Sequence, residues 1–127
     1  MKLHPDTRSN QHIVTAYEPG RVAINGRFLS RSLLLTPDQL DETWGPEAFA
    51  ALTPDHLVQL TTFACDVVLI GTGRQQRFPP PALLRPLIDA RRGFEIMDTA
   101  AACRTYNILV AEGRAVLAAL IIEGDAL

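Results

Sequence analysis

The chain has 127 residues, 47% of them hydrophobic, so it is long enough for one domain with a sizeable buried core. Its formal net charge is −2, which argues against a general nucleic-acid-binding protein, since that class needs a basic face. We therefore expect a single domain over residues 1–127 and no nucleic-acid partner.

The N-terminal part of the chain predicts a small β layer. Residues 1–11 are polar and are expected to form a loose leader. The turn signals are EPG at 18–20, where proline presets φ and glycine accepts a positive φ, and the hairpin dipeptide NG at 25–26. Strands are expected at 12–17, 21–24, 28–29 and 33–35. Together they predict an antiparallel meander that continues to about Leu35.

The tripeptide TPD occurs twice, at 36–38 and at 53–55. It combines a threonine N-cap, a proline at the first helical position and an acidic residue in the first turn. The second copy predicts a helix, because Leu57, Leu60, Thr61 and Ala64 follow on one stripe. The first copy opens at most a short helical turn, and the stretch 41–49 is expected to be mostly loop.

Strands and helices alternate in the second half of the chain. We expect strands at 67–70, 94–97 and 114–122, and helices at 81–90 and from 99 to about 112. Asp98 or Thr99 caps the second of these helices and Gly113 ends it. Apolar strands that alternate with helices indicate a sheet covered on both faces, whose first two strands are parallel. The direction of the last strand stays open, and a central position is expected for it.

Cysteine, histidine and the longest apolar run restrict the function classes further. Cys65 and Cys103 lie among apolar residues, so we interpret them as small buried side chains in a reducing compartment, with no disulfide. The three histidines are scattered and match no metal-ligand spacing, so neither a metal nor a cofactor is expected. The N-terminus lacks the apolar core of a secretory signal. The run 115–122 is too short to span a bilayer, and we expect a soluble, cytoplasmic protein.

The sequence GTGRQQRFPPP at 71–81 follows a buried strand and invites comparison with nucleotide-binding loops. A phosphate-binding P-loop needs a lysine followed by Ser or Thr at the start of a helix, and the chain has no lysine after Lys2. A dinucleotide fingerprint needs a third glycine where Gln76 stands, and the prolines delay the helix. We therefore interpret the glycines as turn residues and not as a nucleotide motif. The arginines of this loop, Arg74 and Arg77, form a basic cluster that is typical of a solvated face.

The location of this loop predicts a candidate site. The loop leaves the carboxyl end of one parallel strand and Asp98 leaves the carboxyl end of the next, and ligands of open α/β sheets prefer that edge. The predicted partner or ligand surface comprises Gly71, Thr72, Gly73, Arg74, Gln75, Gln76, Asp98, Thr99, Arg104, Tyr106 and Asn107. Structural roles are the competing interpretation: Asp98 as a helix cap, Tyr106 in the core, and Arg104 and Asn107 bonded to the loop. No nucleophile–base pair is visible, so no catalytic residue is predicted.

Three stretches together, LIGTGRQQRFPPP, GFEIMDTAAACRTYNIL and AEGRAVLAALII, resemble a family of small domains of uncharacterised biochemistry. The family occurs in bacteria and archaea and includes the mitochondrial respiratory complex I assembly factor 3. The resemblance runs from about Arg21 to Ile122. It implies a three-layer α/β fold with a central mixed sheet, helices packed on it and an additional small N-terminal antiparallel β layer. Its shared surface or scaffold would be formed by Gly71, Gly73, Arg74, Phe78, Pro79, Thr99, Arg104, Tyr106 and Asn107.

The resemblance implies a non-enzymatic binding module that assists assembly of a membrane-associated complex through protein partners. Because no mitochondrial targeting extension is seen, we expect a bacterial, cytoplasmic member. The alternative is a small-molecule or anion-binding protein, or an enzyme, in which Arg74 and Arg104 hold an anion and Tyr106 orients it. A deep pocket would favour this alternative, and a flat apolar patch with a polar rim would favour a protein partner. The oligomeric state stays open.

Overall fold

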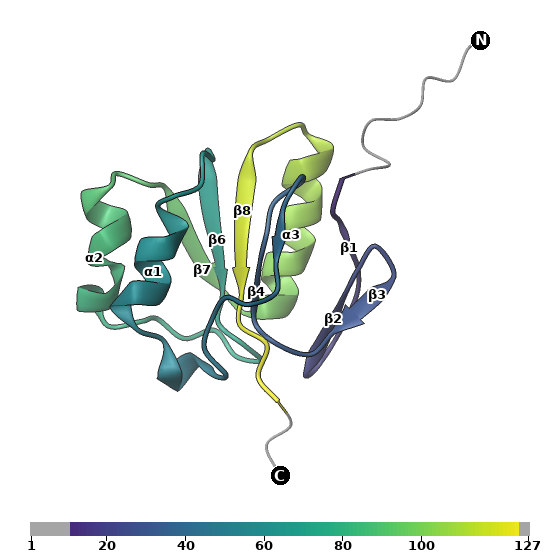
Figure 1. Cartoon of the computed structure of the whole chain (residues 1–127), viewed down its shortest axis with the longest axis horizontal. Helices are drawn as coiled ribbons and strands as arrows, with labels where there is room; N and C mark the ends of the chain where they lie inside the picture. The colour runs from purple at the N-terminus through teal and green to yellow at the C-terminus, as the bar shows by residue number, and fades with distance from the viewer. Residues whose placement is uncertain (1–10, 125–127) are drawn as a thin grey trace.

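The computed structural model describes residues 11–124, which fold into three layers (Figure 1). A five-stranded sheet with the order β5-β4-β8-β6-β7 forms the middle layer. Helices α1 and α2 cover one face, and helix α3 lies on the other face together with a separate three-stranded sheet (Figure 1). This arrangement confirms the predicted three-layer α/β fold. The leader expected at 1–11 lies outside the described residues, apart from Gln11.

The small antiparallel sheet consists of β1 (Val14–Glu18), β2 (Arg21–Ile24) and β3 (Arg27–Leu29). The NG dipeptide forms the predicted hairpin turn, with φ values of 49° and 87°. The prediction that the meander continues to Leu35 was wrong. β4 (Leu33–Leu35) instead pairs with β8 in the central sheet, because its leucines are buried on both faces and need cover on both.

The two TPD tripeptides have different outcomes. The first forms a tight turn in the hairpin between β4 and β5 (Leu40–Asp41), in which the Thr36 N–H donates to the Gln39 carbonyl at 2.9 Å; no helical turn forms there. The second starts helix α1 (Pro54–Leu60) as predicted, after the short 3-10 helix η2 (Phe49–Ala51).

The second half of the chain follows the predicted order. The elements are β6 (Val67–Gly71), α2 (Pro81–Asp89), β7 (Phe94–Met97), α3 (Thr99–Ala111) and β8 (Val116–Leu120). Asp98 caps α3 through the Ala101 N–H at 2.8 Å, and Gly113 follows it with a φ of 79°. β8 occupies the predicted central position, parallel to β6 and antiparallel to β4, and its strand is shorter than the predicted 114–122.

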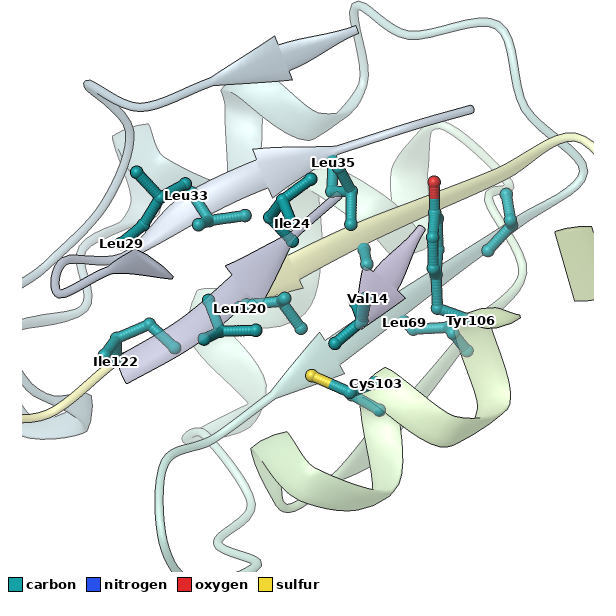
Figure 2. Packing of buried hydrophobic residues seen from close by; sticks show 14 of the residues in the cluster. Val14, Ile24, Leu29, Leu33, Leu35, Leu69, Cys103, Tyr106, Leu120 and Ile122 are labelled. Atoms are coloured by element: carbon teal, nitrogen blue, oxygen red, sulfur yellow. The ribbon is translucent and has the colours of Figure 1, made fainter. Parts of the chain in front are cut away.

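Two hydrophobic clusters lie on opposite faces of the central sheet. The cluster on the α3 side contains Cys103 and Tyr106, among side chains of the sheet and of the small β layer (Figure 2). Burial raises the pKa of the Cys103 thiol to about 12, so at neutral pH it is a protonated, apolar side chain. Both cysteines are free thiols, and Cys65 is half-buried.

Candidate functional site

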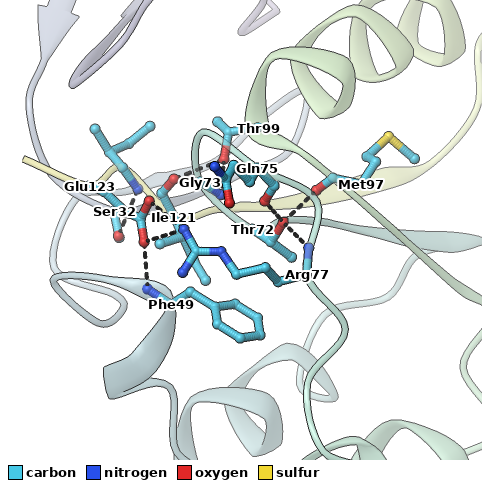
Figure 3. Close-up of polar contacts among 11 residues, drawn as sticks. Ser32, Phe49, Thr72, Gly73, Gln75, Arg77, Met97, Thr99, Ile121 and Glu123 are labelled. Atoms are coloured by element: carbon cyan, nitrogen blue, oxygen red, sulfur yellow. Dashed lines mark hydrogen bonds and ion pairs between the residues drawn. The ribbon is translucent and has the colours of Figure 1, made fainter.

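The loop after β6 and the start of α3 meet at the carboxyl edge of the parallel strands, as predicted, because Gly71 is paired with Met97 in register. Thr99 joins them. Its N–H donates to the Gly73 carbonyl at 2.9 Å, and its hydroxyl accepts from the Gly73 N–H at 2.8 Å (Figure 3). The same hydroxyl donates to the carbonyl of Ile121 at 2.8 Å. One fully buried threonine therefore ties together the loop, the helix and the end of β8.

Thr72 closes the loop on itself. Its buried hydroxyl lies 2.6 Å from the Gln75 carbonyl, to which it donates, and accepts from the Arg77 N–H at 3.1 Å. The Gln76 side chain is held as well, because its Nε2 donates to the Ile96 carbonyl of β7 at 3.0 Å. The loop is thus a closed, hydrogen-bonded turn.

The glycines of the loop are required by close packing. A Cβ at Gly71 would lie 2.9 Å from Thr99 Oγ1 and 3.0 Å from Thr99 Cα. Gly73 has a φ of +102°, and a Cβ there would overlap the carboxylate of Glu123. Both glycines are explained by neighbouring protein atoms without a bound phosphate, in agreement with the interpretation of this loop as a turn.

Arg77 and Glu123 form an ion pair that sequence reasoning missed. Arg77 Nη2 lies 3.1 and 3.3 Å from the two carboxylate oxygens, and Oε2 also accepts from the Phe49 N–H at 3.0 Å (Figure 3). The interpretation of Arg77 as part of a solvated basic cluster was wrong, because its side chain is half-buried against this carboxylate. Glu123 lies 46 residues after Arg77 in the sequence, and no local pattern links the two residues.

The exposed part of the edge consists of Arg74, Gln75, Gln76 and Phe78. Phe78 is 70% exposed, the highest value among the exposed large hydrophobic residues of the described chain. The same loop borders an open hollow of about 450 Å³, which is lined by Glu47, Ala48, Arg74, Gln75, Arg77, Glu123 and Gly124. Its charges are of both signs.

Tyr17 adds a phenol from the small β layer to this edge, which sequence reasoning also missed. Burial is the main cause that raises its pKa, Cys103 raises it further, and the charge of Arg74 opposes the shift. The carboxylates of Asp98 and Glu123 act on the same phenol. Tyr17 therefore lies within electrostatic range of both the glycine loop and the start of α3.

Three predicted site residues lie away from the glycine loop. Tyr106 is fully buried, and its hydroxyl donates to the His12 carbonyl at 2.7 Å. Asn107 accepts from the Val14 N–H at 2.9 Å and donates to the Val14 carbonyl at 2.7 Å, so the prediction that it bonds the loop was wrong. Arg104 lies in a small hollow between β1 and α3. At 1.5 Å per residue, Asn107 is about 12 Å along the helix from Thr99, too far to reach the loop.

Neither a metal centre nor a membrane-spanning helix is found in the described part of the chain. Within residues 11–124, no three His, Cys, Asp or Glu side chains are grouped so that they could bind a metal ion. None of the helices in this range has the length and apolar character needed to cross a bilayer.

The chain is similar to a known protein family and to solved structures of bacterial proteins. A family model described as "Protein of unknown function (DUF498/DUF598)" matches residues 14–121, which include the glycine loop and all of α3. A crystal structure of a protein from Bordetella parapertussis superposes with a TM-score of 0.83 at 39% sequence identity, covering 94% of this chain and 100% of that one. The fold is thus shared with a bacterial relative.

Two curated relatives carry different names. The "13 kDa major membrane protein" of Francisella tularensis subsp. holarctica (strain LVS) is 29% identical over 106 residues, which cover 83% of this chain and 86% of that protein. The NADH dehydrogenase (ubiquinone) 1 alpha subcomplex assembly factor 3 of Drosophila melanogaster is 38% identical over 85 residues, 62% of this chain and 42% of the fly protein. The predicted resemblance to this assembly factor is confirmed.

Proposed function

The chain belongs to the family of proteins of unknown function DUF498/DUF598, and on that premise we propose that it is a non-catalytic binding module acting on protein partners, in the manner of an assembly factor. Its relatives named complex I assembly factor 3 support this direction. The matched region covers only 42% of the fly protein and 59% of the bovine one, so their activity as whole proteins enters here as part of the proposal. A cytoplasmic location stays a prediction, since another relative is named a membrane protein.

The observation that carries the proposal is Phe78, a mostly exposed aromatic side chain on a constrained loop. Buried Thr72 and Thr99 fix the loop before it, and prolines follow it. A loop whose backbone is already held in place loses little backbone entropy on binding, and burial of a phenylalanine contributes about 1.5–3 kcal/mol. Exposed glutamine and arginine residues flank it, which is the composition of an interface anchor with a polar rim.

The small-ligand alternative has less support. The neighbouring hollow is open, and its Arg77 is already paired with Glu123. Tyr106, which would have to orient an anion, donates its hydroxyl to the His12 carbonyl inside the core. Glu47 and Glu123 would repel an anion at the same place. The geometry therefore favours a protein partner at this edge.

We would test the proposal by in-cell crosslinking and affinity capture of the tagged full chain, with quantitative mass spectrometry of the recovered proteins. Phe78→Asp is the test variant. Ile108→Asp is its matched control, because Ile108 is also exposed, at 58%, but lies on α3. Arg74→Glu, on the same loop, is a second test variant.

Subunits of a respiratory complex should be enriched with the wild type and with Ile108→Asp. Phe78→Asp should lower their recovery about tenfold, since 1.4 kcal/mol corresponds to that factor. Equal recovery of these subunits by Phe78→Asp and by the wild type would show that Phe78 is not part of the interface. Capture of no such subunit by the wild type would contradict the assembly role. Urea unfolding of each variant separates loss of binding from loss of folding.

A further inference from the structure

β7 is an edge strand of the central sheet, with β6 as its strand neighbour among the described residues. The directions of its backbone groups follow from the parallel pairing. The Gly93 carbonyl accepts from Val68 and the Met97 carbonyl accepts from Thr72, each at 2.9 Å. Because these directions alternate along a strand, residues 93, 95 and 97 bond to β6. The backbone groups of Phe94 and Ile96 therefore face outward.

One outward group already has a partner from the glycine loop. The carbonyl of Ile96 accepts the Gln76 side chain at 3.0 Å, so Gln76 occupies the next rung of the ladder. The N–H and carbonyl of Phe94 and the N–H of Ile96 remain directed away from β6. These groups offer an extended segment a short ladder that ends at Gln76.

The charge of Glu95, at the centre of the β7 edge, determines which kind of segment can pair with this strand. Phe94 and Ile96 pack into the cluster on the α1–α2 side, so the exposed Glu95 between them points to the α3 side. A symmetric antiparallel pairing with a second copy, centred on β7, would place Glu95 opposite Glu95, and like charges at such positions are destabilising. A segment with a lysine or arginine beside Glu95 would gain a cross-strand ion pair instead.

We propose that the open edge of β7 binds an extended segment of a partner protein by β-strand addition, with a basic residue of that segment beside Glu95. This inference rests on the proposed function, because it names how a partner engages the edge that includes Gln76. The occupant is thus defined by its chemistry: extended, apolar on the side facing α1 and α2, and basic at its centre.

The test selects binders for the folded full chain from a random eight-residue peptide library and measures the affinity of the selected peptides. The expected peptides carry a central lysine or arginine. Glu95→Lys should weaken them about tenfold, and Glu95→Gln by less, because the cross-strand pair changes from attractive to repulsive or neutral. Equal affinity for Glu95→Lys, or selected peptides without a basic residue, would overturn the inference.

Amide hydrogen exchange gives a second readout that a surface charge effect alone would not produce. Bound peptide should slow exchange at Phe94 and Ile96, whose N–H groups face outward, and leave Glu95 and Met97 unchanged, because their N–H groups already bond to β6. Protection on α3, or on none of these residues, would place the peptide elsewhere and overturn the proposed mode.

The assembly role and strand addition at β7 can be contradicted independently of each other. Respiratory subunits that are captured equally by the wild type and by Glu95→Lys would leave the assembly role standing and overturn strand addition. Peptides that protect Phe94 and Ile96, without capture of any respiratory subunit, would support the edge and contradict the assembly role. A second copy bound at β7 would appear as a dimer by analytical ultracentrifugation, and would also overturn the inference.

Discussion

Replacement of Gly73 by alanine should destabilise the protein by more than its backbone conformation alone explains. A φ of +102° costs an alanine about 1–2 kcal/mol. The new Cβ would also overlap the Glu123 carboxylate and lie 2.6 Å from its Cδ. Glu123 cannot move without loss of its bonds to Arg77 and to the Phe49 N–H, and hydrogen bonds to charged groups contribute about 1.5–3 kcal/mol. We expect a total of about 3–4 kcal/mol.

Gly113→Ala is the matched control. Gly113 also has a positive φ, +79°, but a Cβ added there would meet nothing within 4 Å, so only the backbone cost of about 1–2 kcal/mol applies. Urea unfolding monitored by circular dichroism gives both free energies. In the Glu123→Ala background, Gly73→Ala should cost no more than the control. If Gly73→Ala in the wild type costs only as much as Gly113→Ala, then Glu123 is not held in place and does not require a glycine at position 73.

Two further predictions concern the N-terminus of α1 and the attachment of β1. The Nδ1 atom of His56 accepts the Thr53 N–H at 2.9 Å, and burial lowers the pKa of the His56 ring. The stability that this cap contributes is therefore fully present above the ordinary pKa of 6.5. It is lost as the pH falls through the lower pKa of the folded state. His56→Gln keeps a hydrogen-bond acceptor but has no titrating ring. Between neutral and acidic pH, the wild type should therefore lose about 1 kcal/mol more unfolding free energy than this variant, and urea unfolding that shows no such difference would contradict the cap. Tyr106→Phe removes the bond to the His12 carbonyl, so it should cost about 1 kcal/mol of unfolding free energy and speed amide exchange in β1. Unchanged exchange in β1 would show that Asn107 holds the strand alone.

The elements of the second half could be predicted because local signals agree with tertiary structure. Asp98 caps α3, Gly113 follows it, and β6 carries the continuous apolar run of a strand covered on both faces. β4 was misplaced for the opposite reason. Three leucines after a meander favour a fourth meander strand by proximity, and only the distant β8 supplies the pairing that buries them on both faces.

The part of the candidate site that depends on the register of neighbouring strands could be predicted. The part that depends on contacts between distant segments could not. The juxtaposition of the glycine loop with Thr99 follows from the pairing of two parallel strands. The partners of Tyr106 and Asn107 lie 94 and 93 residues away, and the carboxylate that binds Arg77 lies 46 residues away. Polar residues on a helix face show that a bond is needed, but the sequence offers no indication of which segment supplies it.

The central position of β8 has a consequence for the order in which the chain can fold during synthesis. β4 and β6 are not neighbours in the sheet: each pairs with β8, which follows both of them in sequence. Until residues 116–120 leave the ribosome, the hairpin of β4 and β5 and the parallel pair of β6 and β7 remain separate, each with an unpaired edge of apolar residues. Contacts such as Leu33 with Leu120 also span most of the chain, and such long loops slow folding. The nascent chain is therefore most prone to aggregation just before β8 emerges.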